Sequence, residues 1–253
     1  MAGKERLFTT QGLILKSKPF GERDRLISLL SPGRGKLTCV APGARKTKSS
    51  LAALVEPFTY GNYLMHQGRN LYTIRQADII TFFSRLRNDL ESYTFASHIC
   101  QLVDDVVEDD GGQIRELFKL LYRSLLFMEK GAAPALIGLA FHFKLLKLLG
   151  YAPHLAGCLH CGREASIYYL HVEEGGIVCF NCLKSADSSS YLSQGSLALA
   201  RLLLKGNWAA INHLKLNEEQ YKELSFFSRV FLQRWLGVEN FKAFNFLEKL
   251  NRT

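Results

Sequence analysis

The sequence predicts an α+β protein of two parts, a small β-barrel followed by an α-helical domain with an inserted cysteine-rich segment. Turn-separated short strands fill residues 7–80, whereas helical spacing of apolar residues begins after about residue 85. Of the 253 residues 47% are hydrophobic, which is enough for a core in each part. We expect domains over 1–82 and 83–253, the second interrupted by an insert over 154–186.

The first part shows the two-residue period of strands. Residues 58–65 alternate between two faces, and proline–glycine turns such as Ser31-Pro32-Gly33 separate the apolar runs. About five short strands in some seventy residues suit a small barrel, of which the five-stranded OB-fold is the example. The expected strands are 13–15, 26–30, 37–41, 58–65 and 71–75.

The second part shows helical periodicity with recognisable ends. Asn88 and Glu91 form a candidate capping pair, apolar residues then recur at spacings of three and four, and Gly111-Gly112 ends the run. Asn217 with Gln220 predicts another cap, and Gly237 a stop. Further helices are expected over 114–125, 134–150, 196–205, 218–236 and 239–250.

Positive charge is concentrated in the first third of the chain. Residues 1–87 hold 15 Lys and Arg against 5 Asp and Glu, whereas residues 88–253 hold 17 against 18. Such asymmetry is the electrostatic pattern of a protein that binds a polyanion, most often nucleic acid. The densest basic segments predict phosphate contacts by Arg34, Lys36, Arg45, Lys46 and Lys48.

Aromatic residues of the barrel have two open interpretations. Phe58, Tyr60, Tyr63 and Tyr72 are able to stack on single-stranded bases, but alternating aromatics on a strand more often form the core. The basic segments also have a plainer interpretation, as solvated turns.

Four cysteines form two pairs with metal-site spacing. Cys158 and Cys161 are followed after seventeen residues by Cys179 and Cys182, within the CxxC…CxxC pattern of zinc ribbons. A hairpin between the pairs brings the two knuckles together, with strands over 167–172 and 177–178. Four thiolates complete a tetrahedron and leave no open position, so we expect one structural zinc ion.

Other uses of these cysteines fit less well. Disulfides need an oxidising compartment, and no signal peptide is seen, while a redox pair would leave the second CxxC unexplained. His154, His160 and His171 lie near enough in sequence to replace a cysteine. Cys39 and Cys100 fall in apolar patterns and are expected in cores.

No catalytic grouping stands out in the sequence, so an enzyme is not expected. Neither basic segment matches a P-loop, and no Ser/His/Asp, Cys/His or HExxH arrangement is present. The most apolar stretch, 135–149, is broken by charged residues, so no membrane association is expected. No small-molecule substrate is indicated either, and the expected location is the cytoplasm.

An ordered set of motifs resembles the bacterial DNA repair and recombination mediator family RecO. The set begins with residues 12–15 and Phe20-Gly21-Glu22-Arg23-Asp24-Arg25-Leu26. It continues through residues 35–37, 42–45, 48–49 and 56–58, and the helical part and cysteine insert suit the family too.

The resemblance implies a barrel that binds single- and double-stranded DNA and anneals complementary strands. It also implies partners: RecR, the acidic C-terminal tail of the single-strand-binding protein SSB and, indirectly, RecA, which is loaded onto SSB-coated DNA. A bacterial, nucleoid-associated location follows from it. Two alternatives remain: a zinc-dependent nucleic-acid hydrolase, and a zinc-ribbon adaptor whose basic domain binds RNA or a protein.

Overall fold

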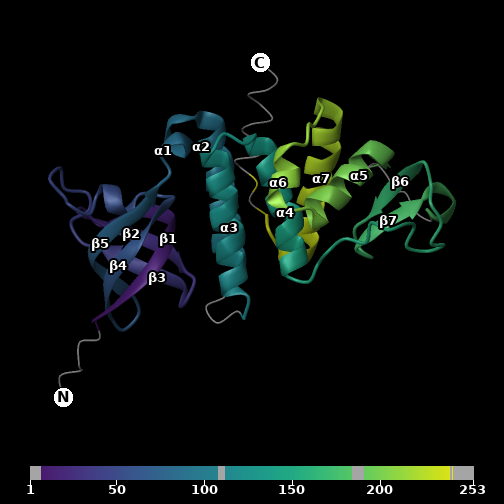
Figure 1. Cartoon of the computed structure of the whole chain (residues 1–253). Helices are drawn as coiled ribbons and strands as arrows, with labels where there is room; N and C mark the ends of the chain where they lie inside the picture. Colours follow the sequence, from purple (N-terminus) through teal and green to yellow (C-terminus); the bar gives the residue numbers. More distant parts are fainter. Residues whose placement is uncertain (1–6, 108–111, 184–190, 240, 242–253) are drawn as a thin grey trace. The chain divides into compact units, whose positions relative to one another are not determined.

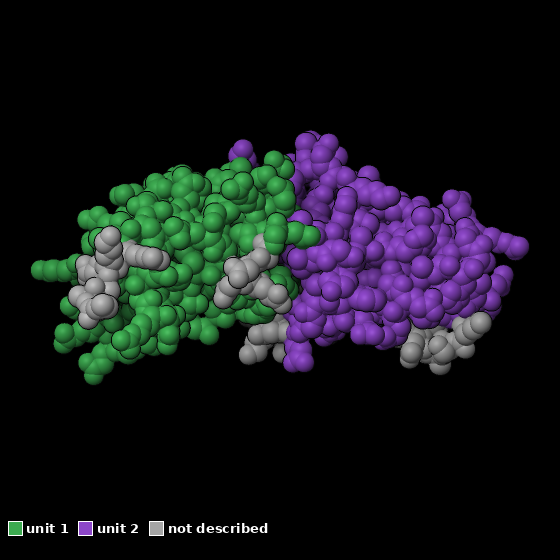
Figure 2. Space-filling view, turned by 90° about the horizontal axis from the view of Figure 1, so that it is seen from below, with its two compact units in different colours: residues 1–129 green, residues 130–253 purple. Residues whose placement is uncertain are grey.

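The computed structural model describes residues 7–107, 112–183, 191–239 and 241. The chain divides into two compact units, residues 1–129 and residues 130–253 (Figure 2). The first is rich in strands and the second in helices (Figure 1). Strand gives way to helix where β5 ends at Phe82 and α1 begins at Ser84, although the first compact unit continues to Glu129. The domain limits expected from the sequence stay a prediction.

Five strands of the first unit form an OB-like barrel in which each strand pairs with two neighbours. Their order is β1-β2-β3-β5-β4, and β4 pairs back to β1. The pairs are antiparallel except for a short parallel contact between β3 and β5, at Cys39–Tyr72 and Val40–Thr73. All five expected strands are present, and β1 and β5 are longer than expected. The bounds are β1 Leu7–Phe20, β2 Asp24–Ser31, β3 Gly35–Ala41, β4 Thr59–Gln67 and β5 Tyr72–Phe82.

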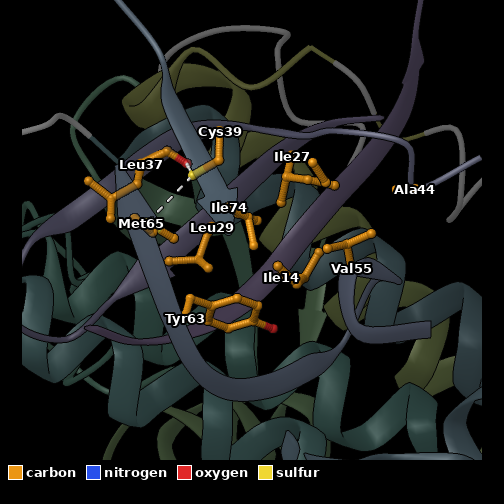
Figure 3. Close-up of a cluster of buried hydrophobic side chains, with 11 residues drawn as sticks. Ile14, Ile27, Leu29, Leu37, Cys39, Ala44, Val55, Tyr63, Met65 and Ile74 are labelled. Carbon is orange, nitrogen blue, oxygen red and sulfur yellow. Dashed lines mark hydrogen bonds between the residues drawn. The ribbon is translucent and has the colours of Figure 1, made fainter. Parts of the chain in front are cut away.

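Alternation of side chains builds the barrel core. In β3 the odd-numbered residues are buried and the even-numbered ones point outward, which is the two-residue period of a pleated strand. Figure 3 shows Tyr63 and Met65 of β4 among the aliphatic side chains of the other strands. The buried Cys39 lies beside Met65, and burial raises the pKa of its thiol to about 12, so it is a core residue as expected.

Strand β4 contains a position that only glycine fits. A Cβ on Gly61 would lie 2.5 Å from the backbone carbonyl oxygen of Asp78 in the neighbouring strand β5. Backbone cannot rotate away as a side chain can, so the close approach of β4 and β5 depends on this glycine.

Two side chains attach helices of the first unit to the barrel. The carboxylate of Asp104 in α2 accepts a hydrogen bond from Ser28 at 2.5 Å, and its backbone carbonyl accepts one from Lys36 at 2.8 Å. Arg87 of α1 donates to the carbonyl of Pro57 and to Oγ1 of Thr59, and its guanidinium lies over the ring of Phe82. The helices are α1 Ser84–Asn88, α2 Leu90–Val106 and α3 Ile114–Glu129.

The predicted start of α2 was wrong by one residue. Asp89, not Asn88, is the N-cap, and its carboxylate accepts from the Ser92 amide at 2.8 Å. Asn88 instead ends α1, a short helix that has too few residues to show a period.

Among its described residues, the second unit contains four α-helices and a three-stranded sheet. The capping box of Asn217 with Gln220 and the left-handed Gly237 that ends α7 confirm both sequence predictions. The helix expected over 239–250 falls, apart from Glu239 and Phe241, outside the described residues. None of the helices described here has the length and apolar character needed to cross a membrane. The bounds are α4 Pro134–Leu148, α5 Gln194–Lys205, α6 Trp208–Asn212, α7 Glu218–Leu236, β6 Ile167–His171, β7 Gly176–Cys179 and β8 Tyr191–Ser193.

Candidate metal centre and nucleic-acid interface

The fold brings the four cysteines of the ribbon together. Their sulfur atoms all lie within 4.8 Å of one another, and those of Cys161 and Cys179 are 3.8 Å apart. A disulfide bond is about 2.05 Å long, so this distance excludes one between Cys161 and Cys179. Two sulfurs on a tetrahedral zinc ion at about 2.3 Å are separated by about 3.8 Å, which matches the observed pair. The cysteine geometry is therefore that of a metal site.

Backbone hydrogen bonds shape the first knuckle. The amide of Gly162 donates to the Cys158 carbonyl at 2.9 Å, and Gly162 has a φ of +70°, which favours glycine. The amide of Leu159 donates to the carbonyl of Ile177 at 2.9 Å, which ties this knuckle to β7. The second knuckle follows β7 directly, as Cys179 ends that strand and Cys182 ends the single 3₁₀ turn after it. The hairpin expected from the sequence therefore joins the two knuckles.

The electrostatics of the four sulfurs favour a bound cation. Burial raises the pKa of Cys158, but amide groups of Cys161, Cys179 and His160 donate to its sulfur, and the pKa falls to about 6. Hydrogen bonds with the sulfurs of Cys161 and Cys179 instead raise the pKa of Cys182 to about 12. Four sulfurs in contact cannot all be thiolates without a positive ion between them.

The histidines near the cysteines take other positions. His154 makes an isolated bridge to Gly176 through the backbone. His160 and His171 gather with Glu174 in a separate group. The hydrogen bond to Glu174 raises the pKa of His160, whose other ring nitrogen lies 3.3 Å from the carbonyl of Cys182.

The loop after β3 and the turn between β1 and β2 meet at one end of the barrel and bring basic residues together. Arg45 donates from its guanidinium to the Gly21 carbonyl at 2.7 Å, and its amide donates to the Arg23 carbonyl at 3.0 Å. The amide of Gly43 in turn donates to the carboxylate of Asp24. We call the resulting group of exposed cations the basic loop cluster: Arg23, Arg45, Lys46 and Lys48.

The other two predicted phosphate contacts lie elsewhere on the barrel. Arg34 is in the turn between β2 and β3, at the opposite end, with its guanidinium 4.0 Å from the ring centre of Phe8. Strand β3 separates the two ends, and its seven residues span roughly 20 Å. Lys36 is half-buried, and its ammonium donates to the Asp104 carbonyl. The structure thus gathers three of the five predicted residues in one place.

The barrel aromatics pack against protein. Tyr63 and Phe58 are buried, and the Tyr60 ring lies 5.2 Å from that of Tyr122 in α3. Tyr72 is half-buried and meets the edge of Phe8 at 5.7 Å. These contacts favour the core interpretation over base stacking.

Sequence reasoning missed one member of the basic loop cluster. Arg23 lies in a tight turn between β1 and β2, far in sequence from Arg45. Its signal in the sequence was its place two residues after the turn glycine Gly21, which favours an exposed residue but does not indicate which loop it meets.

Comparisons with known proteins cover both units. Residues 4–83 match the family model described as Recombination protein O N terminal, and residues 87–243 match Recombination protein O C terminal. The DNA repair protein RecO of Alkaliphilus metalliredigens is 32% identical over 246 residues, which are 96% of this chain and 100% of that protein. That of Desulfitobacterium hafniense is 34% identical, over 91% of this chain and 85% of its own length. This chain therefore belongs to the RecO family.

Proposed function

We propose that this chain is a DNA-binding recombination mediator of DNA repair and has no active site of its own. The observation that carries the proposal is the match to RecO proteins along nearly the whole chain, whose names state a role in DNA repair. The basic loop cluster supplies a physical reason for DNA binding, because four exposed cations on two adjoining loops suit a phosphate backbone.

The proposed DNA contacts read no sequence. Lysine and arginine on loops neutralise phosphates, which are the same in every sequence and in both single and double strands. Of the aromatics considered for stacking, Phe58 and Tyr63 are buried and Tyr60 packs against Tyr122, so we expect affinity to depend mainly on charge. Such binding suits a protein that acts on DNA wherever damage occurs, including the annealing of two complementary strands.

The cysteine site is proposed to hold one structural zinc ion. Sulfur is the ligand that zinc prefers in closed structural sites, and the spacing of the sulfurs fits a tetrahedron. With all four positions filled by protein, the ion would hold the ribbon in shape and would not activate water. The absence of an open position at the four cysteines is our reason for proposing that this ion is structural and not catalytic.

The proposed partners come from the family resemblance. We include RecR, the acidic C-terminal tail of SSB and, through loading onto SSB-coated DNA, RecA. We also propose a cytoplasmic, nucleoid-associated location for the chain.

Replacement of Arg45, Lys46 and Lys48 by Gln tests the DNA-binding proposal. The full chain should bind labelled single- and double-stranded DNA of any sequence, and the triple variant should bind each more weakly. The matched control replaces exposed lysines of the second unit, Lys147, Lys205 and Lys215, and removes the same charge. Equal affinity of the triple variant and wild type would refute the assignment of the site.

The same assay separates the proposal from its rivals. RNA that competes much better than single-stranded DNA would favour the adaptor that binds RNA. Cleavage of the labelled strand with added zinc or magnesium would favour a hydrolase.

A further inference from the structure

Three metal-binding side chains of the ribbon gather outside the cysteine site. The Nε2 atom of His160 lies 2.7 Å from Oε2 of Glu174, and Nε2 of His171 lies 3.7 Å from Oε1 of the same carboxylate. The three ligand atoms all lie within 4.8 Å of one another. Two ligands about 2.1 Å from a tetrahedral ion are about 3.4 Å apart, so small rotations would bring all three onto one ion.

The backbone fixes the places of these residues. His171 ends β6 and pairs with Gly176 of β7. Glu174 lies in the turn between the two strands. Gly175, in the left-handed conformation, closes this turn, and its amide donates a hydrogen bond to the Val172 carbonyl. His160 comes from the first knuckle, next to the residue that is bonded to β7. His160 therefore meets two residues that lie 11 and 14 positions later in the sequence, on a hydrogen-bonded frame.

The ring of His160 is oriented as a metal ligand requires. A histidine that binds an ion through one nitrogen usually donates the other ring N–H to a carbonyl or carboxylate. Nδ1 of His160 lies 3.3 Å from the carbonyl of Cys182, so Nε2 is the nitrogen that faces the other two ligands.

The ring of His171 lacks the hydrogen bonds that would explain its position. Its Nδ1 atom is buried and has no hydrogen-bond partner. Its Nε2 atom, at 3.7 Å from the carboxylate, is beyond hydrogen-bond distance. A hydrogen-bonded pair of Glu174 and His160 therefore leaves Nε2 of His171 without a hydrogen bond, whereas an ion held between the three residues would bind to this nitrogen. The ion would not change the surroundings of the buried Nδ1.

We propose that His160, His171 and Glu174 form a second metal site, which binds a divalent transition-metal ion such as zinc. Imidazole nitrogen with one carboxylate suits zinc, nickel and copper rather than magnesium or calcium. Three protein ligands leave an open position, and His160 and Glu174 are partly exposed, so this ion exchanges more readily than one in the cysteine site. The open position is available to water or to a ligand from a partner molecule.

Zinc titration of the full chain, with its cysteine site already filled, tests this site. Wild type should take up one further equivalent of zinc by calorimetry. His171→Asn and Glu174→Gln should each bind that equivalent at least about tenfold more weakly, since even the loss of outer-shell partners has that effect. Two control variants should bind it as wild type does: Glu173→Gln, in the same turn, and His213→Gln, on an exposed loop.

Two further measurements keep the result interpretable. Each variant should retain its first equivalent of zinc, which shows that the ribbon is folded. X-ray absorption at the nickel edge, with nickel added in place of the second equivalent of zinc, should show nitrogen and oxygen but no sulfur among its ligands. The proposal is overturned if wild type takes up no further equivalent, if sulfur binds the added ion, or if both ligand variants bind it normally.

Discussion

Replacement of Cys161 by Ser should abolish metal binding by the ribbon. Cys161 is exposed, so the substitution leaves no cavity, and it removes one of the four sulfurs. Structural zinc contributes on the order of 10 kcal/mol to the folding of small zinc modules, so the ribbon should unfold locally without the ion. The control is Cys100→Ala, because Cys100 is buried in α2 and outside the metal site.

Zinc analysis combined with thiol titration measures this effect. Wild type should hold one zinc per chain with no thiol that reacts quickly, because burial raises the pKa of Cys39 and Cys100 and the metal protects the rest. Chelation should release the ion and expose the ribbon thiols, and denaturant should then expose Cys39 and Cys100. X-ray absorption should show four sulfurs at about 2.3 Å from zinc. Zinc retained by Cys161→Ser, or fast reaction of native thiols without metal release, would refute the reasoning.

Three further perturbations test the barrel and its helices, each by urea unfolding. Gly61→Ala places a Cβ against the Asp78 carbonyl and should cost about 1–3 kcal/mol, whereas Gly33→Ala, with open space around it, should cost less than about 1 kcal/mol. Lys36→Met should cost about 1 kcal/mol through the lost bond to Asp104. If Lys36 instead contacts phosphate, Lys36→Met should change the slope of log affinity for single-stranded DNA against log salt by about 0.7. Burial lowers the pKa of His98 to about 3, so on acidification the unfolded chain binds a proton at His98 before the folded chain does. Stability therefore falls as pH drops below about 6.5. Between pH 7 and pH 5 the free energy of unfolding should fall by about 2 kcal/mol more for wild type than for His98→Leu. Equal losses would contradict the inference that burial keeps His98 neutral.

Local patterns in the sequence predicted the elements well. The two-residue period located the barrel strands, and the cap at Asn217 with the stop at Gly237 located α7. The cysteine spacing predicted the four residues that the fold brings together. Each of these signals is contained within a few residues of the chain, which is why sequence alone was enough.

Long-range packing was beyond the reach of those patterns. Nothing near Lys36 indicated that its ammonium would meet the carbonyl of Asp104, since Asp104 lies 68 residues further along the chain. The joining of the two basic loops by Arg45 depends on how β1, β2 and β3 pair around the barrel. The position of His160 beside Glu174 likewise depends on the folded knuckle and not on any sequence spacing.

Short elements were missed for a different reason. Helices α1 and α6 each have five residues, and strand β8 has three. Such segments are too short to show a period, and they form because neighbouring elements supply contacts and hydrogen bonds. Strand β8, for example, pairs with β6 and thereby extends the ribbon sheet.

The most direct test of the account is the salt dependence of single-stranded DNA binding by wild type and by the Arg45, Lys46 and Lys48 triple variant. Each phosphate contact contributes about −0.7 to the slope of log affinity against log salt, so five contacts give about −3.5. These contacts are the basic loop cluster and Arg34. Loss of three contacts should reduce the slope to about −1.4. Between 50 and 200 mM salt, affinity should then fall roughly 130-fold for wild type and about 7-fold for the variant. Equal slopes for the two proteins, or an affinity of wild type that does not change with salt, would contradict the proposal that the basic loop cluster binds DNA.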